Sequence, residues 1–448
     1  MDVTGKNITV IGAGRSGTGA AKLIKKVGGI PFVSDAGNEN GLSGSINNLN
    51  EAGINYETGT HSDKVYNCET MVVSPGVPAD AVVLNNARGN NIKLISEVEL
   101  AYEFCKGKII AITGTNGKTT TTSLCGHVFN NCGFKTHVAG NIGLAFSEIA
   151  PNVKENDFVA LEVSSFQLDL IDKFKPAVAM ILNITPDHLN RYDNDLGKYA
   201  ASKQQIYKNQ DENDYLILNG SNETVLKYLK DHKSKSYMFA QNAEQNFGCH
   251  VENEDVIFRS EGDEKFRCSR SDINMRGEHN LANAMAVIIA AKINDLDNDK
   301  IIGALHTFES VEHRLELVKE IGGVKFINDS KATNVDSVWY ALRSFDEQIF
   351  LILGGQDKGN DYEQIKQLVI DKVVKVYAIG SSADKIFNFF HSSVKVEIKN
   401  TMKDVITSAI NEARRGEVVL LSPACASFDM FDNYEHRGKA FKEAVNNI

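Results

Sequence analysis

A short run of glycine, lysine and threonine residues at 113–120 has the composition of a binding site for phosphate groups. Gly114 and Gly117 carry no Cβ, so the backbone beside them can approach phosphate oxygens closely. Lys118 would reach the β- and γ-phosphates of a nucleotide, and the Thr119 hydroxyl would bind Mg²⁺. These residue types in this order predict a nucleoside triphosphate site.

The elements on either side of this run would hold it in place. Residues 108–113 predict a buried strand, and a helix is predicted to open after Lys118. The first turn of that helix would direct free N–H groups and its positive dipole end at a phosphate. The general phosphate-loop pattern has glycine where this chain has Ile112, so the loop is a shorter form. The alternative is a threonine-rich turn that binds nothing.

Acidic and histidine side chains follow two later strands, predicted at 158–163 and 177–183. The carboxyl ends of parallel strands meet at one edge of a sheet, so Glu162, Asp187 and His188 should converge on the phosphate loop. Glu162 could hold the Mg²⁺ bound by the loop threonine, and His188 a second Mg²⁺. A histidine in such a loop could instead hydrogen-bond to a backbone carbonyl. Convergence with a phosphate loop favours the metal site.

Two helical segments carry polar residues whose roles the pattern leaves open. Residues 198–208 have helical periodicity, and on that pattern Lys203 is a solvent-exposed helix lysine. An apolar helix is predicted from 277 to 292, with Asn280 and Asn283 one turn apart on one face. These two amides could face an adenine or could simply cap the helix.

The N-terminal residues have the fingerprint of a site for a diphosphate group. A strand at 7–12 runs into the sequence Gly-Ala-Gly-Arg-Ser-Gly at 12–17, where a helix is predicted to start. A second strand, at 31–35, ends in Asp35, which is placed to meet a ribose hydroxyl. An NAD-dependent oxidoreductase is therefore one interpretation. A UDP-sugar also carries a diphosphate, and its binding is the other interpretation.

A further strand of this region, predicted at 70–74, ends in Ser74 and the tight turn Pro-Gly-Val-Pro at 75–78. The turn would lie at the carboxyl edge of the sheet, where ligands bind in open α/β folds. Ser74 and Gly76 are therefore candidate ligand contacts. A plain turn between a strand and a helix is an equally good interpretation.

Composition places the chain among ordinary globular proteins and excludes several functions. Of 448 residues, 42% are hydrophobic and 24% are charged, and no apolar run is long enough to span a membrane. We therefore expect a cytoplasmic protein without membrane insertion. The seven cysteines include no Cys-x-x-Cys pair, which favours reduced thiols over disulfides or zinc. A net charge of −10 argues against nucleic-acid binding.

We predict an α/β fold in three domains, at 1–95, 96–308 and 309–448. The first is Rossmann-like, and the second has a mostly parallel sheet of the P-loop ATPase type with an antiparallel hairpin region at 241–272. The third is a second Rossmann-like domain, whose strands are predicted at 324–328, 349–353, 374–379, 394–398 and 418–421.

Polar clusters again follow the strands of the last domain, at 328–334, 354–359 and 422–428. They contain lysines, hydroxyl groups and glycines, which is typical of a ligand-binding edge rather than of a purely structural sheet. Arg314 lies at the junction of the second and third domains. From there it could reach back to the phosphates when the domains close.

The order of these clusters along nearly the whole chain resembles the Mur ligase family, the ATP-dependent amino-acid ligases of peptidoglycan synthesis. The most specific agreements are the phosphate loop at 114–120, Leu-Glu-Val-Ser-Ser-Phe-Gln-Leu at 161–168, His-Asn at 279–280, His-Arg at 313–314, Asn-Asp-Ser-Lys-Ala-Thr-Asn at 328–334 and Leu-Ser-Pro-Ala-Cys-Ala-Ser at 421–427. The resemblance implies a domain that binds a UDP-linked substrate, a central ATPase domain and a last domain that binds the incoming amino acid.

The resemblance also implies roles for individual residues. It places an ATP site at Gly114, Thr115, Asn116, Gly117, Lys118, Thr119, Thr120, Asn280, Asn283, Arg314, Asp329 and Lys331. It places a UDP-substrate site at Gly14, Arg15, Ser16, Gly17, Asp35, Ser74, Gly76 and Asn141, and a D-glutamate site at Thr333, Lys358, Ser427 and Tyr434. Thr119, Glu162, His188 and Lys203 resemble ligands of two Mg²⁺ ions, and the implied catalytic residues are Lys118, His188, Lys203 and Arg314. Lys203 matches a lysine that is carbamylated in the family, which turns a repelling cation into a metal-binding carboxylate.

The chain departs from the family's pattern at two places. Tyr434 stands where the D-glutamate pocket has phenylalanine, so the ring is kept and a hydroxyl is added. Ala36 and Gly37 follow Asp35, where the family often has threonine and arginine for the uracil nucleotide. The second departure leaves open how the uracil would be held.

The resemblance implies a reaction in which ATP activates UDP-N-acetylmuramoyl-L-alanine as an acyl phosphate and D-glutamate then attacks it. A monomer is expected. Three alternatives stay open: a related ligase that adds L-lysine, diaminopimelate or polyglutamate, an NAD-dependent oxidoreductase with an NTPase domain, and a non-catalytic nucleotide-binding module.

Overall fold

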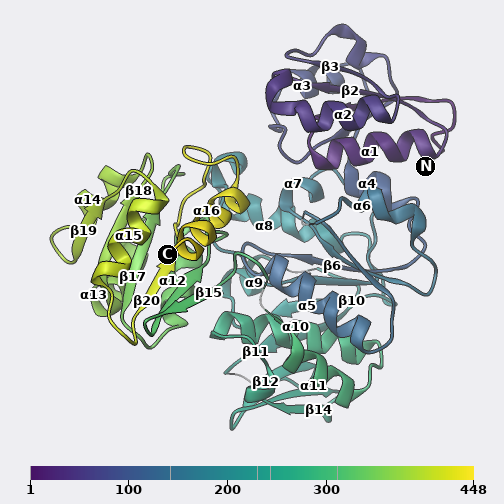
Figure 1. Cartoon of the computed structure of the whole chain (residues 1–448). Coiled ribbons are helices and arrows are strands. Elements are labelled where there is room, and N and C mark those ends of the chain that lie inside the picture. The colour runs from purple at the N-terminus through teal and green to yellow at the C-terminus, as the bar shows by residue number, and fades with distance from the viewer. Residues whose placement is uncertain (1, 142, 230, 243, 310) are drawn as a thin grey trace. The chain divides into compact units, whose positions relative to one another are not determined.

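The computed structural model describes the chain except residues 1, 142, 230, 243 and 310. The chain forms three β-sheets, each with helices packed on it, and Figure 1 colours them in chain order from purple to yellow. Packing divides the chain into two compact units, Met1–Ile273 with Ala282–Thr307 and Asn274–Leu281 with Phe308–Ile448. The first unit holds two of the sheets and the second unit holds the third.

The N-terminal sheet has five parallel strands in the order β3-β2-β1-β4-β5. The strands are β1 (Asn7–Ile11), β2 (Ile30–Asp35), β3 (Asn55–Thr58), β4 (Thr70–Val73) and β5 (Lys93–Ser96). The helices are α1 (Arg15–Lys26), α2 (Ser43–Glu51) and α3 (Val82–Gly89), with 3₁₀ turns η1 (Glu39–Leu42) and η2 (Asp63–Tyr66). Because all five strands run in parallel, the loops that follow them open at one edge of the sheet.

The central sheet has nine strands in the order β14-β13-β12-β11-β10-β9-β6-β8-β7. The strands are β6 (Lys108–Thr113), β7 (Thr136–Gly140), β8 (Phe158–Glu162), β9 (Val178–Ile181), β10 (Tyr215–Asn219), β11 (Lys235–Ala240), β12 (Gly248–Glu252), β13 (Asp255–Ser260) and β14 (Asp263–Ser269). Pairing is parallel from β7 to β12 and antiparallel from β12 to β14, which agrees with the predicted hairpin region.

Eight helices accompany the central sheet in the described residues. They are α4 (Glu97–Tyr102), α5 (Lys118–Asn131), α6 (Phe146–Ile149), α7 (Ser165–Leu168), α8 (Leu196–Gln204), α9 (Glu223–Tyr228), α10 (Glu278–Ile293) and α11 (Asn298–Thr307). Four 3₁₀ turns accompany them, η3 (Ala150–Asn152), η4 (Leu189–Tyr192), η5 (Gln205–Tyr207) and η6 (Arg270–Asp272).

The C-terminal sheet has six strands in the order β15-β16-β20-β17-β18-β19. They are β15 (Glu316–Ile321), β16 (Val324–Asn328), β17 (Ile349–Gly354), β18 (Val373–Ile379), β19 (Lys395–Ile398) and β20 (Val418–Leu421), all parallel except β15. The helices are α12 (Val335–Arg343), α13 (Glu363–Lys372), α14 (Ala383–Phe390), α15 (Met402–Glu412) and α16 (Tyr434–Asn446). The edge strand β15 was not predicted from the sequence.

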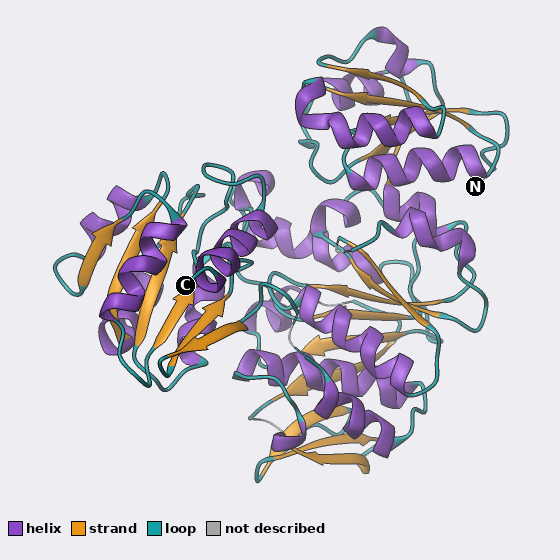
Figure 2. Cartoon of the chain, viewed as in Figure 1, coloured by secondary structure: helices purple, strands orange, loops and turns teal. Residues whose placement is uncertain are grey.

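Apolar cores lie on both faces of the C-terminal sheet. One core packs the sheet against α12, α13 and α14, and the other packs it against α15 and α16. Figure 2 shows the strands of this sheet between those helices, which is the doubly wound arrangement that the alternating pattern predicts. The predicted α/β class with three sheet domains is therefore confirmed.

The other two sheets share an apolar core. It contains Val10 and Ile24 from the N-terminal sheet and its first helix, and Ala111, Leu161 and Leu216 from the central strands. Among the described residues, every helix is too short or too polar to cross a membrane.

Candidate active site

The predicted phosphate loop joins β6, an inner strand of the central sheet, to the start of α5. Gly117 precedes the helix with φ 85°, a conformation in which a side chain would be strained. A Cβ at this position would also lie 2.5 Å from Oδ1 of Asn283. Asn283, one of the predicted ATP contacts, therefore lies directly against the loop.

Asn183 fixes the shape of this loop. Its side-chain Oδ1 accepts hydrogen bonds from the N–H groups of Thr115 at 3.1 Å and Asn116 at 2.8 Å. Its Nδ2 donates to the carbonyl oxygen of Asn116 at 3.0 Å. Sequence analysis did not select Asn183 as a site residue. The available signal was its place just after β9, at the same sheet edge as the residues that were selected.

The side chain of Lys118 folds back over the loop. Its Nζ donates to the carbonyl oxygens of Gly114 at 2.9 Å and Thr115 at 2.8 Å. The Thr115 hydroxyl in turn donates to the carbonyl oxygen of Thr185 at 3.1 Å and accepts from the Thr185 N–H at 3.0 Å. These bonds tie the loop after β9 to the phosphate loop. Thr120 is buried in the first turn of α5.

Two of the predicted metal ligands lie together at the carboxyl edge of the central sheet. The Thr119 hydroxyl donates to Oε2 of Glu162 at 2.8 Å, and the other carboxylate oxygen accepts from Nδ2 of Asn141 at 3.1 Å. Glu162 is 1% exposed. A buried carboxylate bonded to these neutral groups, with a hydroxyl beside it, provides the oxygen ligands that Mg²⁺ prefers. The donor set therefore fits this ion.

Lys203 lies in α8 and is 1% exposed, so the interpretation of a solvent-exposed helix lysine is wrong. Its Nζ donates to the carbonyl oxygen of Gly114 at 2.8 Å and lies 4.5 Å from the centre of the Tyr199 ring. Burial and then the charge of Lys118 hold the pKa of Lys203 well below its usual value, although Asp187 acts in the opposite direction. The amine of Lys203, beside the phosphate loop, is therefore easier to deprotonate than that of an exposed lysine.

His188 follows the strand β9 in a left-handed backbone conformation, with φ 51°. Its Nε2 lies 3.8 Å from a carboxylate oxygen of Asp187, and its ring meets that of Phe166 edge-on at 5.3 Å between centres. The side chain is 38% exposed. A partly exposed imidazole held by an aromatic ring is suited to bind a ligand or an ion.

A cavity of about 700 Å³ opens at the carboxyl edge of the N-terminal sheet. It is lined by the loop after β1, the ends of β2 and β4 and the start of α3, and the predicted residues among its lining are Gly14, Arg15, Ser16, Asp35, Ser74 and Gly76. The first turn of α1 begins at Arg15 in this cavity, so its N–H groups can bind an anion there.

Two predicted residues of this site, Gly17 and Asp35, also determine the backbone conformation of the loops that line the cavity. A Cβ on Gly17 would lie 1.8 Å from the carbonyl oxygen of Gly12, so only glycine fits there. The two carboxylate oxygens of Asp35 accept from the N–H groups of Ala13 at 2.6 Å and Gly37 at 2.7 Å. Each of these oxygens can accept a further hydrogen bond, so Asp35 both holds the loop and faces the cavity.

Two arginines connect this cavity with the loops of the central sheet. Nη1 of Arg15 donates to the carbonyl oxygen of Gly143 at 2.7 Å, two residues after Asn141. From the other direction, Arg191 donates to the carbonyl oxygens of Pro75 at 3.0 Å and Val77 at 2.8 Å. These bonds bring the predicted UDP-substrate residues of both sheets to one region of the first unit.

The Arg191 guanidinium is also held on the central-sheet side. It lies 3.9 Å from the centre of the Phe166 ring, the same ring that contacts His188. The side chains of Arg191 and Phe166 thus join the turn at 75–78 to the His188 loop. Sequence analysis did not select Arg191, because a single arginine in a polar loop gives no local signal.

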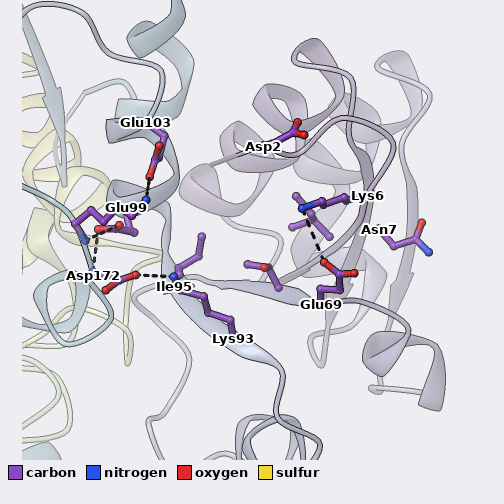
Figure 3. Close-up of a pocket in the computed structure, with 12 residues that line it drawn as sticks. Asp2, Lys6, Asn7, Glu69, Lys93, Ile95, Glu99, Glu103 and Asp172 are labelled. Carbon is purple, nitrogen blue, oxygen red and sulfur yellow. Dashed lines mark hydrogen bonds and ion pairs between the residues drawn. The ribbon is translucent and has the colours of Figure 1, made fainter.

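A smaller cavity of about 230 Å³ lies at the amino ends of β1, β4 and β5 (Figure 3). Its charged side chains are paired with one another: Lys93 with Asp172 at 2.5 Å, and Lys6 with Glu69 at 4.0 Å. Ligands of parallel sheets bind at the carboxyl ends of the strands, which open at the opposite edge. This cavity is therefore not a candidate active site.

The second unit holds the remaining predicted residues at the carboxyl edge of its own sheet. Asp329 follows β16 and accepts from the Ser422 hydroxyl at 2.9 Å and from the Leu315 N–H at 3.4 Å. Burial raises the pKa of Asp329 to about 6, and the charge of Arg314 partly opposes this rise. A buried carboxyl with a raised pKa near an arginine is typical of a functional group.

The predicted amino-acid site residues lie in the loops at this edge. Lys331 Nζ lies 5.1 Å from the centre of the Tyr434 ring, and Tyr434 begins α16. Ser427 is buried after β20, Lys358 is exposed after β17, and Thr333 is half-buried before α12. Asn280, also in this unit, donates from Nδ2 to the carbonyl oxygen of Arg276 at 2.8 Å.

A buried arginine that the sequence analysis missed joins two of these loops. Arg437 donates to the carbonyl oxygen of Ser330 at 2.8 Å and to that of Cys425 at 3.0 Å. Burial lowers its pKa to about 10, so it remains charged at neutral pH. It holds the loops that contain Lys331 and Ser427 in a fixed relation.

Comparison with known families finds three models that match successive parts of the chain. A model of the MurD N-terminal domain matches residues 7–83, one of the Mur ligase middle domain matches 112–291, and one of the Mur ligase glutamate ligase domain matches 313–425. The chain is 41% identical over 450 residues to the UDP-N-acetylmuramoylalanine–D-glutamate ligase of Salinibacter ruber, covering 98% of this chain and 97% of that one. It is 42% identical over 446 residues to the ligase of the same name from Koribacter versatilis, covering 99% and 98%.

The chain belongs to the Mur ligase family. Solved structures of this family share its fold. The UDP-N-acetylmuramate-alanine ligase MurC of Thermotoga maritima superposes with a TM-score of 0.66 at 19% identity, and each chain is covered to 99%. The MurF ligase of the same organism, solved with ADP, gives a TM-score of 0.61 at 15% identity, with 100% and 96% covered.

Membership in the Mur ligase family decides between two of the interpretations of the N-terminal fingerprint. The members are ATP-dependent ligases, so the fingerprint belongs to a ligase and not to an NAD-dependent oxidoreductase. The roles of single residues in the sites above remain predictions.

Proposed function

We propose that this Mur ligase joins D-glutamate to UDP-N-acetylmuramoyl-L-alanine and releases ADP and phosphate. The observation that carries the proposal is the identity of 41–42% over at least 97% of both chains to curated ligases named for this reaction. We also propose that the enzyme is a cytoplasmic monomer.

Each predicted domain has its own substrate in this proposal. Residues 1–95 bind the uracil nucleotide in the 700 Å³ cavity, where the start of α1 meets the diphosphate. Residues 96–308 bind ATP at the phosphate loop, with Asn283 beside it. Residues 309–448 bind D-glutamate through Thr333, Lys358, Ser427 and Tyr434. Arg314, Asp329 and Lys331 of the same domain bind ATP, as does Asn280 of the central domain.

The reaction takes place in two steps. The L-alanyl carboxylate oxygen attacks the γ-phosphorus of ATP, the bond to the bridging oxygen breaks, and ADP leaves. The amine of D-glutamate then attacks the carbonyl carbon of the acyl phosphate, an amide bond forms and phosphate leaves. Lys118 orients the γ-phosphoryl group and stabilises its charge, and we assign the same role to Arg314. The loops exclude water, which would otherwise hydrolyse the intermediate.

Two Mg²⁺ ions fit this site as cofactors. Thr119 and Glu162 would hold one ion, and His188 and a carbamylated Lys203 would hold the other. Bound Mg²⁺ neutralises charge on the phosphate oxygens. The burial of Lys203 and its lowered pKa support carbamylation, because only an uncharged amine reacts with CO₂.

Phosphate release measured with a panel of amino acids tests the proposed activity. With ATP and UDP-N-acetylmuramoyl-L-alanine present, we expect release with D-glutamate and none with L-glutamate, L-lysine or diaminopimelate. Release with L-glutamate alone would reject the proposal in favour of a related ligase. Full activity in Lys118→Ala would contradict the role of this lysine, and no phosphate release with any of the amino acids would support a non-catalytic nucleotide-binding module.

A further inference from the structure

A histidine that no motif selected lines the cavity of the N-terminal sheet. His61 lies beyond β3, the edge strand of this sheet, and shares the cavity with Asp35 and Ala36 at the end of β2. Ala36 has no side-chain group that can hydrogen-bond to a base. Among the residues that line the cavity, His61 is the one whose side chain is an aromatic ring with polar atoms.

The hydrogen bonds around His61 determine which ring nitrogen carries the proton. Nδ1 of His61 lies 2.7 Å from the hydroxyl oxygen of Ser34. That hydroxyl has two other partners, a carboxylate oxygen of Glu57 at 2.8 Å and the carbonyl oxygen of Thr60 at 3.5 Å. A carbonyl oxygen can only accept a hydrogen bond. Partial burial acts to raise the pKa of Glu57, but hydrogen bonds from Ser62 and Ser34 lower it overall. The Glu57 carboxylate is therefore ionised, and it too can only accept.

Ser34 has one hydroxyl proton, and it must go to Glu57 or to the Thr60 carbonyl. The contact between Ser34 and His61 therefore has Nδ1–H as its donor. A neutral imidazole with its proton on Nδ1 has a lone pair on Nε2. Among the described residues, none donates to this Nε2, and Ser34 holds the opposite side of the ring in the buried interior. The cavity thus contains a fixed hydrogen-bond acceptor.

The position of this acceptor matches one end of a UDP-linked ligand. The diphosphate belongs at the start of α1, and the sugar extends toward Asn141, where Arg15 contacts the central-sheet loop. The base then occupies the opposite side of the cavity, toward β2 and β3. Uracil has one N–H in its ring, N3–H, once the sugar is attached at N1, and an acceptor with no proton is the complement of that group.

We propose that His61 reads the uracil base of the nucleotide substrate by accepting a hydrogen bond from N3–H at Nε2, with Ser34 and Glu57 fixing its tautomer. The proposal rests on the proposed function, since it needs a uracil nucleotide in this cavity. Ala36 and Gly37 stand where the family often has threonine and arginine for the uracil nucleotide. In this chain His61 would take over their contact with the base.

Binding of UDP and of 3-methyl-UDP to the full chain tests the proposal by calorimetry. The methyl group replaces the N3 hydrogen, so wild-type protein should prefer UDP by about tenfold, the usual effect of one hydrogen bond. His61→Leu keeps the bulk of the side chain and removes the acceptor, so it should bind the two nucleotides within about twofold of each other. His61→Gln keeps an acceptor oxygen and should retain part of the preference.

The controls separate this inference from the proposed function. His232→Ala removes a histidine that hydrogen-bonds to the carbonyl of Ser234 and does not line the cavity, so it should leave both affinities unchanged. Every variant should keep the wild-type KM for ATP. Wild-type protein that binds neither nucleotide would contradict the proposed function. A preference for UDP that persists undiminished in His61→Leu, or equal binding of both nucleotides by wild type, would overturn the role of His61.

Discussion

The side-chain nitrogen of Lys203 lies 2.8 Å from the carbonyl oxygen of Gly114 and donates a hydrogen bond to it. Lys118 donates to the same oxygen at 2.9 Å. Two ammonium groups that share one acceptor repel each other, and the buried one loses its proton more readily. Of the two lysines at the phosphate loop, Lys203 is therefore the one that more readily supplies an uncharged amine.

Replacing Lys203 by alanine should abolish activity, because it removes the group that is proposed to become a carboxylate ligand. We expect phosphate release to fall by about a hundredfold or more. Short carboxylic acids such as acetate should restore part of the activity by supplying the missing carboxylate in the cavity left by the side chain. Steady-state phosphate release with and without added acid measures both effects.

Lys198 provides the control for this variant, since it lies in the same helix but is exposed and paired with Asp193 at 2.6 Å. Lys198→Ala should keep wild-type activity and should not respond to added acids. Wild-type activity in Lys203→Ala would remove the carbamate from the mechanism.

Thr119→Val should weaken the binding of Mg²⁺ without disturbing the fold. The variant removes the hydroxyl that contacts Glu162 and keeps the shape of the side chain. We expect the Mg²⁺ concentration for half-maximal activity to rise by about tenfold or more. The matched control is Thr122→Val, because the Thr122 hydroxyl donates only to the backbone of Lys118. An unchanged Mg²⁺ requirement in Thr119→Val would contradict the proposed metal site.

Arg191→Ala should raise the KM for the UDP-linked substrate and leave the KM for ATP near its wild-type value. The guanidinium holds the carbonyls of Pro75 and Val77 at the rim of the nucleotide cavity, so its loss frees this turn. Two lost charge-assisted hydrogen bonds predict an effect of roughly 2 kcal/mol, or about thirtyfold in KM. Initial rates at varied concentrations of each substrate provide the two constants.

Arg267 is a suitable comparison for Arg191, because it pairs with Glu264 and Asp255 on the exposed hairpin of the central sheet. Arg267→Ala should leave both KM values unchanged. Equal increases in the two constants for Arg191→Ala would indicate general damage rather than a role in positioning the turn.

Glu97→Gln should stabilise the protein at alkaline pH. Burial raises the pKa of Glu97 from 4.5 to about 7, although the Ser147 hydrogen bonds oppose the rise. The folded chain therefore binds this proton more tightly than the unfolded chain, and the free energy of unfolding falls as pH rises from about 4.5 to about 7. The glutamine variant does not titrate, so it avoids this decrease in the free energy of unfolding, which amounts to at most about 3 kcal/mol.

Thermal melts at pH 5 and pH 8 measure this difference. The gap in Tm between Glu97→Gln and wild type should be larger at pH 8 than at pH 5. The same substitution at the exposed Glu155 should leave the pH dependence unchanged. A gap of equal size at both pH values would show that Glu97 does not titrate between them.

Much of this architecture could be predicted from the sequence, because its signals are local. Buried parallel strands such as β6 are nearly continuous apolar runs, and the phosphate loop follows from the order of a few adjacent residues. Strands β3 and β15 were missed because they lack such a local signal. Both are short edge strands with several polar residues, so they lack an apolar run.

The surroundings of single side chains could not be predicted, because they depend on contacts between distant segments. Lys203 has the helical spacing of a surface residue, and only the packing of α8 against the phosphate loop buries it. Asn183 and His61 occupy loops without a motif, and their partners come from other strands. Only the folded chain shows that Asn183 fixes the phosphate loop and that Ser34 fixes the imidazole.

The shared apolar core of the N-terminal and central sheets determines how the protein should respond to heat. Neither sheet can lose its structure without exposing the interior of the other, so the two should melt as one cooperative body. The C-terminal sheet has two cores of its own and can unfold separately. A scanning calorimeter should therefore record two endotherms from a chain with three sheets, and UDP should shift only one of them.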